Sequence, residues 1–286
     1  MKKLVISIIV CLAAIASMAQ TKSEILVSYN SINPNKYNKL VTSKMLLLAS
    51  STDAKYFNEL SLWVDSLKST PEGKAKYMDI LKKACMTVEP DGSTSWNLSK
   101  GPVKKTYMYV FSNPAKQTLT VYDKYGEDLG YYTESLSEMK WSMVNDSVKT
   151  ILGYECFMAE SNYHGRHWKA WFTPEIPMSF GPWKLHGLPG LILKAEANGG
   201  FSFTATGIEQ TNRLITPMYL QQDYTKIDRK KGLENAEYYV NNEASIMNAQ
   251  GQNVKIYTVD ENGNKVEVPK YDGLKHSLEP DYKIKR

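Results

Sequence analysis

Hydrophobic and polar residues alternate with a period of two along much of the chain, which is the spacing of side chains on one face of a β-strand. Within residues 166–173, for example, Trp168, Ala170 and Phe172 fall on one face. The predicted strands cover residues 45–48, 107–111, 119–121, 128–135, 140–144, 148–161, 166–173, 191–195 and 201–206. Because short turns join most of them, an antiparallel sheet is expected.

Apolar residues recur at helical spacing in three other parts of the chain. The predicted helices cover residues 54–68, residues 71–85 with Thr70 as N-cap and Pro71 in the first position, and residues 229–248 after Asp228. A last pair of strands, 254–259 and 265–268, flanks Asn262-Gly263, which is a strong hairpin signal.

These elements predict a mainly β protein with helical insertions, of the α+β class. We expect a curved antiparallel sheet with helices packed against it, and an open half-barrel is one form that such a sheet could take. No internal repeat or low-complexity linker divides the chain. Residues 20–286 are therefore predicted to form a single domain, with a helical insertion at about 54–85, a C-terminal helix at about 229–248 and a polar tail after residue 269.

The N-terminus has the three regions of a cleavable signal peptide. Lys2 and Lys3 precede an apolar run from Leu4 to Ile15, and small residues then lead to a predicted cleavage site before Gln20. The apolar run is too short to span a bilayer, which takes about 20 residues. Residues 1–19 are therefore predicted to be a signal peptide, and the mature chain is expected to lack a transmembrane segment. We expect an exported protein that is periplasmic, associated with the outer membrane, or secreted.

The charge of the chain argues against one class of partner. It has 35 Lys and Arg residues against 30 Asp and Glu residues, a formal net charge of +5. This balance lacks the clustered basic footprint of nucleic-acid binding. We therefore predict no nucleic-acid partner.

Residues 186–193 read His-Gly-Leu-Pro-Gly-Leu-Ile-Leu, and further blocks surround this segment. They are Ile151–Cys156, Gly165-Arg166, Ala170–Pro177 and Gly181–Lys184. In these motifs the chain resembles the GLPGLI family. The resemblance implies a signal-bearing protein of a gram-negative cell envelope, in a family with no assigned enzymatic activity.

The signature and the loop before it supply the leading site hypothesis. Turn chemistry accounts for the glycines and the proline, so a purely structural role for the motif stays open. The other reading is that the loop forms the lip of a groove. The candidate binding residues are Trp171, Phe180, Trp183, His186, Gly187, Leu188, Pro189 and Gly190. The predicted function is a non-catalytic envelope protein that binds a partner protein or an apolar ligand beside the loop 174–193.

An alternative function is an envelope enzyme or a metal-binding protein that uses the region from His164 to His186. His164, His167 and His186 lie close in sequence and are weak candidates for zinc or copper ligands. However, His164 and His167 are three positions apart, which places them on opposite faces of a regular strand. We therefore assign no metal and predict no cofactor.

Catalytic signals are missing from the sequence. It contains no nucleophile elbow, zinc-protease motif or phosphate-binding glycine loop. We assign no catalytic residue, and an enzyme is the less favoured class. Cys85 and Cys156 are the two cysteines after the signal peptide. They could pair in an oxidising compartment or be small buried side chains, and spacing does not decide between the two.

Overall fold

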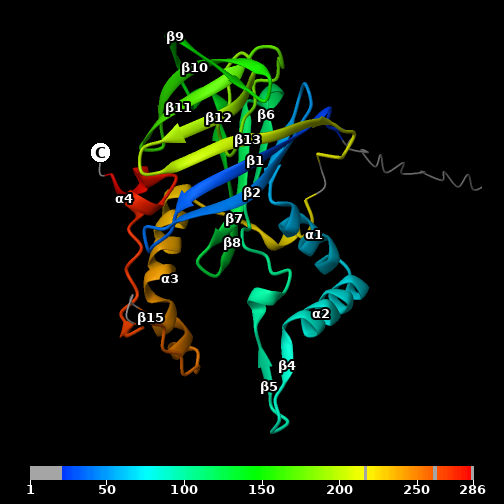
Figure 1. The fold of residues 1–286 in the computed structure, drawn as a ribbon, viewed down its shortest axis with the longest axis vertical. Coiled ribbons are helices and arrows are strands. Elements are labelled where there is room, and N and C mark those ends of the chain that lie inside the picture. Colours follow the sequence, from blue (N-terminus) through cyan, green and yellow to red (C-terminus); the bar gives the residue numbers. More distant parts are fainter. Residues whose placement is uncertain (1–20, 216–217, 260–262, 285–286) are drawn as a thin grey trace, which may run out of the picture.

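The computed structural model describes residues 21–215, 218–259 and 263–284. Twelve strands of this part form one sheet, in the order β14-β8-β7-β6-β3-β2-β1-β13-β12-β11-β10-β9 (Figure 1). They are β1 (Ile25–Pro34), β2 (Leu40–Ala49), β3 (Ala54–Phe57), β6 (Tyr109–Asn113), β7 (Thr118–Tyr125), β8 (Asp128–Ser135), β9 (Ser142–Ile151), β10 (Tyr154–Tyr163), β11 (Arg166–Thr173), β12 (Leu191–Ala197), β13 (Phe201–Gln210) and β14 (Thr225–Lys226). Two short hairpins lie outside it: β4 (Met86–Val88) with β5 (Thr94–Trp96), and β15 (Thr258–Val259) with β16 (Lys265–Val266).

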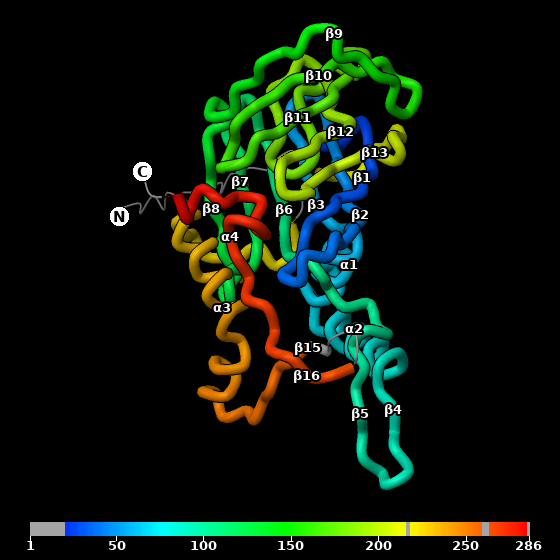
Figure 2. The backbone as a smooth tube through the Cα atoms, turned by 60° about the vertical axis from the view of Figure 1, so that its left-hand side comes forward, coloured from blue at the N-terminus to red at the C-terminus, as the bar shows by residue number. Residues whose placement is uncertain are grey.

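The neighbouring strands of the large sheet are antiparallel, except for β14, which runs parallel to β8. The strand order is linear and ends at β14 and β9, so the sheet is not closed into a barrel. The strands bend along the sheet, and β9 and β10 arch over the top of the molecule (Figure 2). The predicted fold class, mainly β with packed helices, is confirmed.

The described residues contain four α-helices: α1 (Glu59–Lys68), α2 (Pro71–Cys85), α3 (Arg229–Ala249) and α4 (Gly273–His276). α1 packs through Leu62 against one face of the sheet, whereas α3 packs through Leu233 and Ala236 against the larger core on the other face. α2 and the β4–β5 hairpin extend away from the sheet (Figure 1). None of the helices described is both long enough and apolar enough to cross a membrane.

One expected helix begins later than its pattern suggested. Residues 54–57 form β3 between β2 and β6, and α1 starts only after Asn58, whose side chain caps the helix by accepting from Ser61 N. All four residues of β3 are buried, including Lys55. β3 is paired on both sides, with β2 and with β6, and this pairing decides the conformation of the segment. The second helix, capped by Thr70, is as predicted.

The segment 148–161, expected as one strand, is divided by a hairpin turn. The chain reverses at Leu152 and Gly153, both of which have positive φ angles of 53° and 87°. This two-residue turn joins β9 to β10. β1 was not predicted at all, although it pairs with both β2 and β13 near the middle of the sheet.

The polar tail after residue 269 is part of the packed structure. It forms α4 and a short 3-10 helix, Pro280–Lys283. Glu279, Pro280 and Tyr282 are buried there. The tail therefore returns to the body of the protein and contributes charged side chains to its interior.

Candidate functional site

The loop between β11 and β12 packs into the core of the protein. Phe180, Trp183 and Leu188 are each no more than 3% exposed, and His186 is also buried. Among the predicted binding residues of the loop, Gly187 and Pro189 are exposed. Because its apolar side chains point inward, the loop offers no apolar lip to a partner, contrary to the prediction.

The two signature glycines have different structural roles. Gly190 has a φ angle of +153°, and a Cβ atom there would overlap the carbonyl oxygen of Thr173 and lie 2.6 Å from its carbonyl carbon. Gly187 has a φ angle of +85°, but a Cβ atom there would meet no described atom within 4 Å. Gly190 is therefore required for close backbone approach, and Gly187 for its backbone angle alone.

Trp171 lies away from the other predicted binding residues. It is half-buried, and the ammonium groups of Lys149 and Lys194 lie 3.3 Å and 5.2 Å from its ring centroid. A lysine above an indole ring forms a cation–π contact. Trp171 therefore belongs to a lysine-flanked position on the sheet and not to the loop.

The three candidate histidines have separate partners. His167 is exposed, and its Nδ1 lies 3.0 Å from Asn162 Oδ1. The ring nitrogens of His186 lie 2.6 Å and 2.8 Å from the carbonyl oxygens of Lys184 and Leu136. His164 points instead into a buried group of charged side chains. The three histidine side chains therefore do not converge on one point.

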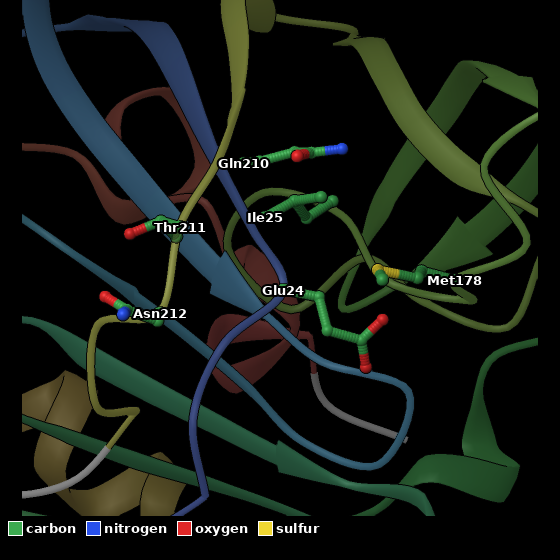
Figure 3. Close-up of a pocket in the computed structure, with 6 residues that line it drawn as sticks. All are labelled: Glu24, Ile25, Met178, Gln210, Thr211 and Asn212. Atoms are coloured by element: carbon green, nitrogen blue, oxygen red, sulfur yellow. The ribbon is translucent and has the colours of Figure 1, made fainter.

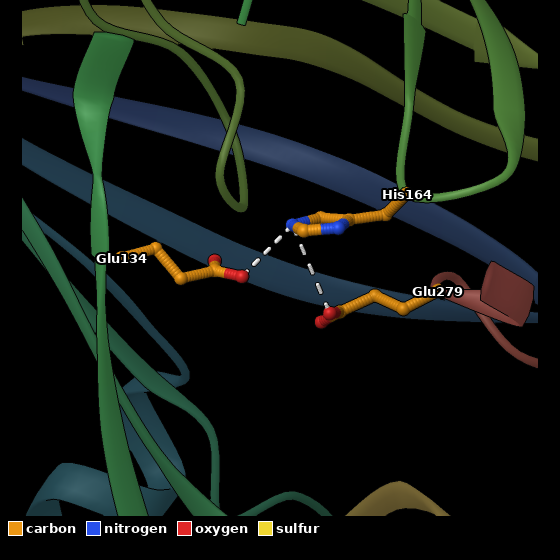
Figure 4. Close-up of side chains that lie close together, drawn as sticks. All are labelled: Glu134, His164 and Glu279. Carbon is orange, nitrogen blue, oxygen red and sulfur yellow. Dashed lines mark ion pairs between the residues drawn. The ribbon is translucent and has the colours of Figure 1, made fainter. Parts of the chain in front are cut away.

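That charged group is the most distinctive polar feature of the protein (Figure 4). His164 Nε2 lies 3.0 Å from Glu134 Oε1 and 3.9 Å from Glu279 Oε2. Lys184 Nζ lies 2.7 Å from Glu134 Oε2 and 2.8 Å from Glu279 Oε2. The Lys184 side chain is completely enclosed. We call Glu134, His164, Lys184, Arg229, Glu279 and Asp281 the charge cluster.

The other two members, Arg229 in the first turn of α3 and Asp281 in the C-terminal tail, form an ion pair with each other. Arg229 Nη1 donates to Glu279 Oε2 at 2.7 Å and to Asp281 Oδ1 at 2.9 Å. Its Nε lies 3.2 Å from Glu134 Oε1. Tyr132 adds a neutral donor, because its hydroxyl group donates to Glu279 Oε1 at 3.1 Å. Every carboxylate of the cluster therefore contacts at least one cation.

Local structure brings these side chains together from five parts of the chain. Glu134 is near the end of β8, and His164 is in the turn between β10 and β11, where it has a φ angle of +50°. Lys184 follows Trp183, which has a φ angle of +54°. Arg229 is the first residue of α3. Left-handed backbone angles at non-glycine residues are uncommon, and here they aim two members of the cluster inward.

The contacts within the charge cluster shift the pKa values of Glu134, His164 and Asp281 in the directions that favour their charged forms. Burial alone would raise the pKa of Glu134, but the approach of His164 and the charge of Lys184 lower it to about 2. Burial works against the charged form of His164, but Asp281 and Glu134 raise its pKa above the ordinary value. The pKa of Asp281 is lowered against its burial by His164 and Arg229. The partners of Glu134, His164 and Asp281 thus each favour the charged form of that side chain.

The cluster does not fit a metal ion. Donor atoms of Glu134, His164 and Glu279 lie within 4.8 Å of one another, which is a spacing that a cation could bridge. However, Lys184 and Arg229 already neutralise both carboxylates at hydrogen-bond distance. A divalent ion would lie beside the ammonium group of Lys184 and the guanidinium group of Arg229, which is electrostatically unfavourable.

A cavity of about 370 Å³ opens beside the cluster. We call it the β8–α3 cavity, because β8 and the segment that leads into α3 form its walls. It is lined by Tyr132, Thr133, Glu134, Glu138, Lys226, Ile227, Asp228, Arg229 and Lys230. Glu134 and Arg229 therefore belong to both the cluster and the cavity wall.

A larger hollow of about 720 Å³ lies beside the start of β1 and the end of β13, with six lining residues (Figure 3). Its only charged lining residue is Glu24, whose Oε1 accepts from the backbone N–H of Ser51 at 2.8 Å. The backbone carbonyl of Glu24 accepts from Thr211 N at 3.0 Å. The β8–α3 cavity has further charged lining residues, among them Glu138, Lys226 and Lys230, so the hollow is the weaker candidate.

Cys85 and Cys156, the two cysteines among the described residues, are free and buried. Cys85 ends α2, and Cys156 lies on β10. Burial raises the pKa of the Cys156 thiol. Of the two readings that the sequence left open, the structure has the small buried side chains.

Several comparisons with known proteins bear on this site. The model of a family described as N-glycanase peptide, N-terminal domain (PNGase F-II) matches residues 131–232. Two solved structures of PNGF-II, in C2 and P21 space groups, are 14% and 15% identical to the chain, each with a TM-score of 0.49. Each alignment covers 75% of this chain but only 33% and 34% of the other, so the chain spans about a third of those proteins. No curated protein matches the chain.

The predicted function is wrong on these findings. A non-catalytic envelope protein that binds a partner or an apolar ligand beside the loop 174–193 would need accessible large apolar side chains there, and Phe180, Trp183 and Leu188 are buried. The matched family is instead one of N-glycanase domains, and its matched range includes the whole loop.

Sequence reasoning missed the acidic members of the cluster and Arg229. Glu134 and Glu279 are far apart in sequence, and nothing nearby marks either as buried. One signal was present: Lys184 follows an apolar Gly-Pro-Trp segment and precedes Leu185. An apolar setting of this kind indicates that the lysine is buried, and a buried lysine is almost always paired with a carboxylate. Lys184 was therefore a signal for buried acidic partners.

Proposed function

We propose that this protein recognises N-linked glycans and that the β8–α3 cavity is its glycan-binding site. One observation carries the proposal: all the residues that line the cavity lie within 131–232, the range that matches the N-glycanase domain family.

The chemistry of the cavity suits a carbohydrate. Sugars are bound by side chains that donate to and accept from hydroxyl groups. Glu138, Lys226 and Lys230 line the cavity, and none of their side chains forms a hydrogen bond or ion pair among the described residues. They are therefore available to a ligand.

The charge cluster holds two side chains of the cavity wall, Glu134 and Arg229, in place. Glu134 and Arg229 are held by several ion pairs, so their side chains are fixed before a ligand arrives. A binding group that is already ordered loses little conformational entropy on binding, which favours affinity.

The test is a calorimetric titration of the purified protein with an N-glycosylated peptide and with the same peptide without its glycan. We expect binding of the glycopeptide only, and a loss of about tenfold or more with Glu138→Gln. Glu209→Gln is the matched control, because Glu209 is an exposed carboxylate on β13 with no ion-pair partner in the described part of the chain. Equal affinity for both peptides, or equal effects of the two variants, would rule out the proposed site.

We further propose that the protein is exported and belongs to the GLPGLI family. The signal-peptide residues lie outside the part of the chain that the structure describes, so the support is the sequence pattern from Lys2 to Ile15. Intact-mass measurement of protein from its native cells should show a chain that starts at Gln20. Retention of residues 1–19 would contradict this proposal.

A further inference from the structure

The β4–β5 hairpin projects from the body of the protein. It extends with α2 away from the large sheet, and its turn is at one end of the molecule in both views (Figure 1, Figure 2). It lies outside residues 131–232, the range that matches the N-glycanase domain family, so this surface is independent of the proposed glycan-binding site. We propose that the hairpin is an interface between two copies of the chain.

One face of the hairpin is apolar and open to solvent. Met86 is paired with Trp96, and Val88 is paired with Thr94, so these four side chains share one face. Val88 is 63% exposed and Trp96 is 45% exposed, and Leu98, two residues further along the chain, is 53% exposed. None of these three belongs to a hydrophobic core of the described residues. The apolar face is therefore without a cover in the described part of the chain.

The other face of the hairpin is polar. Thr87 is paired with Ser95, and the Ser95 hydroxyl group donates to Glu89 Oε1 at 2.6 Å. A sheet with one apolar and one polar face packs its apolar face against another layer. A two-stranded hairpin is also only marginally stable alone in water. The missing layer is therefore expected to come from another polypeptide.

Charged residues along the hairpin indicate which polypeptide fits. Glu89 and Asp91 form an acidic end at the turn, whereas Lys82 in the last turns of α2 and Lys100 after β5 form a lysine end. None of these four side chains forms an ion pair within the described part of the chain. A two-fold axis perpendicular to the hairpin places two copies side by side in opposite directions, so the acidic end of one meets the lysine end of the other. The hairpin is thus complementary to itself in charge.

Other occupants fit this surface less well. The carboxylates of Glu89 and Asp91 would be repelled by anionic lipid headgroups and by the phosphates of nucleic acids. Tryptophan is enriched among the few residues that carry most of the binding free energy of protein–protein interfaces, and Trp96 is the largest side chain of the apolar face. Standard interfaces bury roughly 1,200–2,000 Å², and the hairpin is small, so a weak and reversible dimer is expected.

Analytical ultracentrifugation of the purified chain that starts at Gln20 tests the inference. This chain keeps all the described residues and lacks the apolar run Leu4–Ile15, which could add association of its own. We expect a reversible dimer with a dissociation constant in the micromolar range. Trp96→Ser and Leu98→Ser should each weaken it about tenfold or more. Leu40→Ser is the matched control, because Leu40 is 62% exposed on β2 and lies outside the hairpin, and it should dimerise like the wild type.

An exchange of charges distinguishes a lost interface from a lost fold. The variant with Glu89→Lys and Asp91→Lys has lysines at both ends of the hairpin, and the variant with Lys82→Glu and Lys100→Glu has carboxylates at both ends. Each variant alone should fail to dimerise, because like charges meet across the two-fold axis. An equimolar mixture should form a heterodimer, in which each end meets the opposite charge.

Three results would overturn the inference. A wild-type chain that stays monomeric at millimolar concentration has no such interface. A dimer that Leu98→Ser and Leu40→Ser weaken equally uses another surface. A mixture of the two charge variants that does not associate would mean that the ends of the hairpin do not meet. Glu138→Gln should leave the dimer intact, so failure of the glycan titration is distinguishable from failure of this proposal.

Discussion

Replacing Lys184 with methionine tests whether the charge cluster stabilises the fold. The substitution keeps an unbranched side chain of similar length but removes the ammonium group. In the wild type that group lies 2.7 Å from Glu134 and 2.8 Å from Glu279, with no exposure to solvent. The variant leaves three carboxylates in the cluster with Arg229 and His164 as their remaining cations.

The expected loss is large because the remaining carboxylates stay buried. Removing one partner of a buried ion pair costs about 3–5 kcal/mol. Unfolding entropy near 60 °C is about 2.1 cal/mol/K per residue, or about 0.6 kcal/mol/K for this chain. The melting temperature of Lys184→Met should therefore fall by about 5–8 °C at pH 7.

The loss should depend on pH with a definite sign. The pKa of Glu134 is lowered to about 2 in the folded protein. The stabilisation from this group is present above its unfolded pKa of about 4.3 and is lost as the pH falls towards 2. Without Lys184 the folded pKa rises, so less stability remains to be lost in acid. The difference between wild type and variant should shrink below pH 4.

Thermal unfolding followed by circular dichroism measures the effect, with Lys83→Met as the control. Lys83 pairs with Asp79 at 2.7 Å, but its side chain is 75% exposed. An exposed pair on a helix contributes little, so the control should melt with the wild type. If both variants melt together, or if the difference is independent of pH, the cluster does not stabilise the fold as argued.

Three further predictions concern other parts of the structure. Urea titrations should show that Gly187→Ala lowers the free energy of unfolding by about 1–2 kcal/mol. Gly190→Ala should lower it by more, because the added Cβ atom would overlap the backbone of Thr173, and equal losses would contradict that close contact. His164 has a raised pKa, so its stabilisation is complete below about pH 6.5 and is lost as the pH rises through the folded pKa. His164→Gln should flatten that decline in melting temperature above neutral pH. Thiol titration of the denatured, non-reduced chain that starts at Gln20 should give two free thiols, Cys85 and Cys156, and none would mean that they pair.

Much of the fold was predictable because local patterns carry it. The alternation in β11 gave both the strand and its buried face, and Trp168 and Phe172 are indeed buried while Lys169 is exposed. Side-chain spacing along one segment is enough for such a prediction. The cap and first proline of α2 are equally local signals.

Other elements depend on pairing between distant segments. β3 has a pattern that also fits a helix, and its pairing with β2 and β6 decides its conformation. β1 has serine and asparagine at several positions, so its own sequence is a poor strand signal. It is nevertheless paired along its length on both sides. Tertiary context overrides weak local preference in both cases.

The candidate sites were the least predictable part, because charged residues usually lie at the surface. Glu134, Arg229 and Glu279 have unremarkable neighbours in sequence, and only the folded chain brings them together. The signature loop misled the prediction for a related reason. The sequence suggested that Trp183 is an accessible binding residue. In the structure its backbone has a positive φ angle, and the ring lies in the interior.

The charge cluster is connected through pairs of consecutive residues to a cavity of about 230 Å³, which lies between β1, β2, β3, β13 and Trp183. Trp183 lines the cavity while Lys184 enters the cluster, and Leu278 lines the cavity while Glu279 enters the cluster. Lys184 and Glu279 are themselves joined by an ion pair of 2.8 Å. The same contact therefore joins the loop and the tail beside the cavity. The ion pair therefore links two segments of the chain that are separated by nearly a hundred residues in sequence.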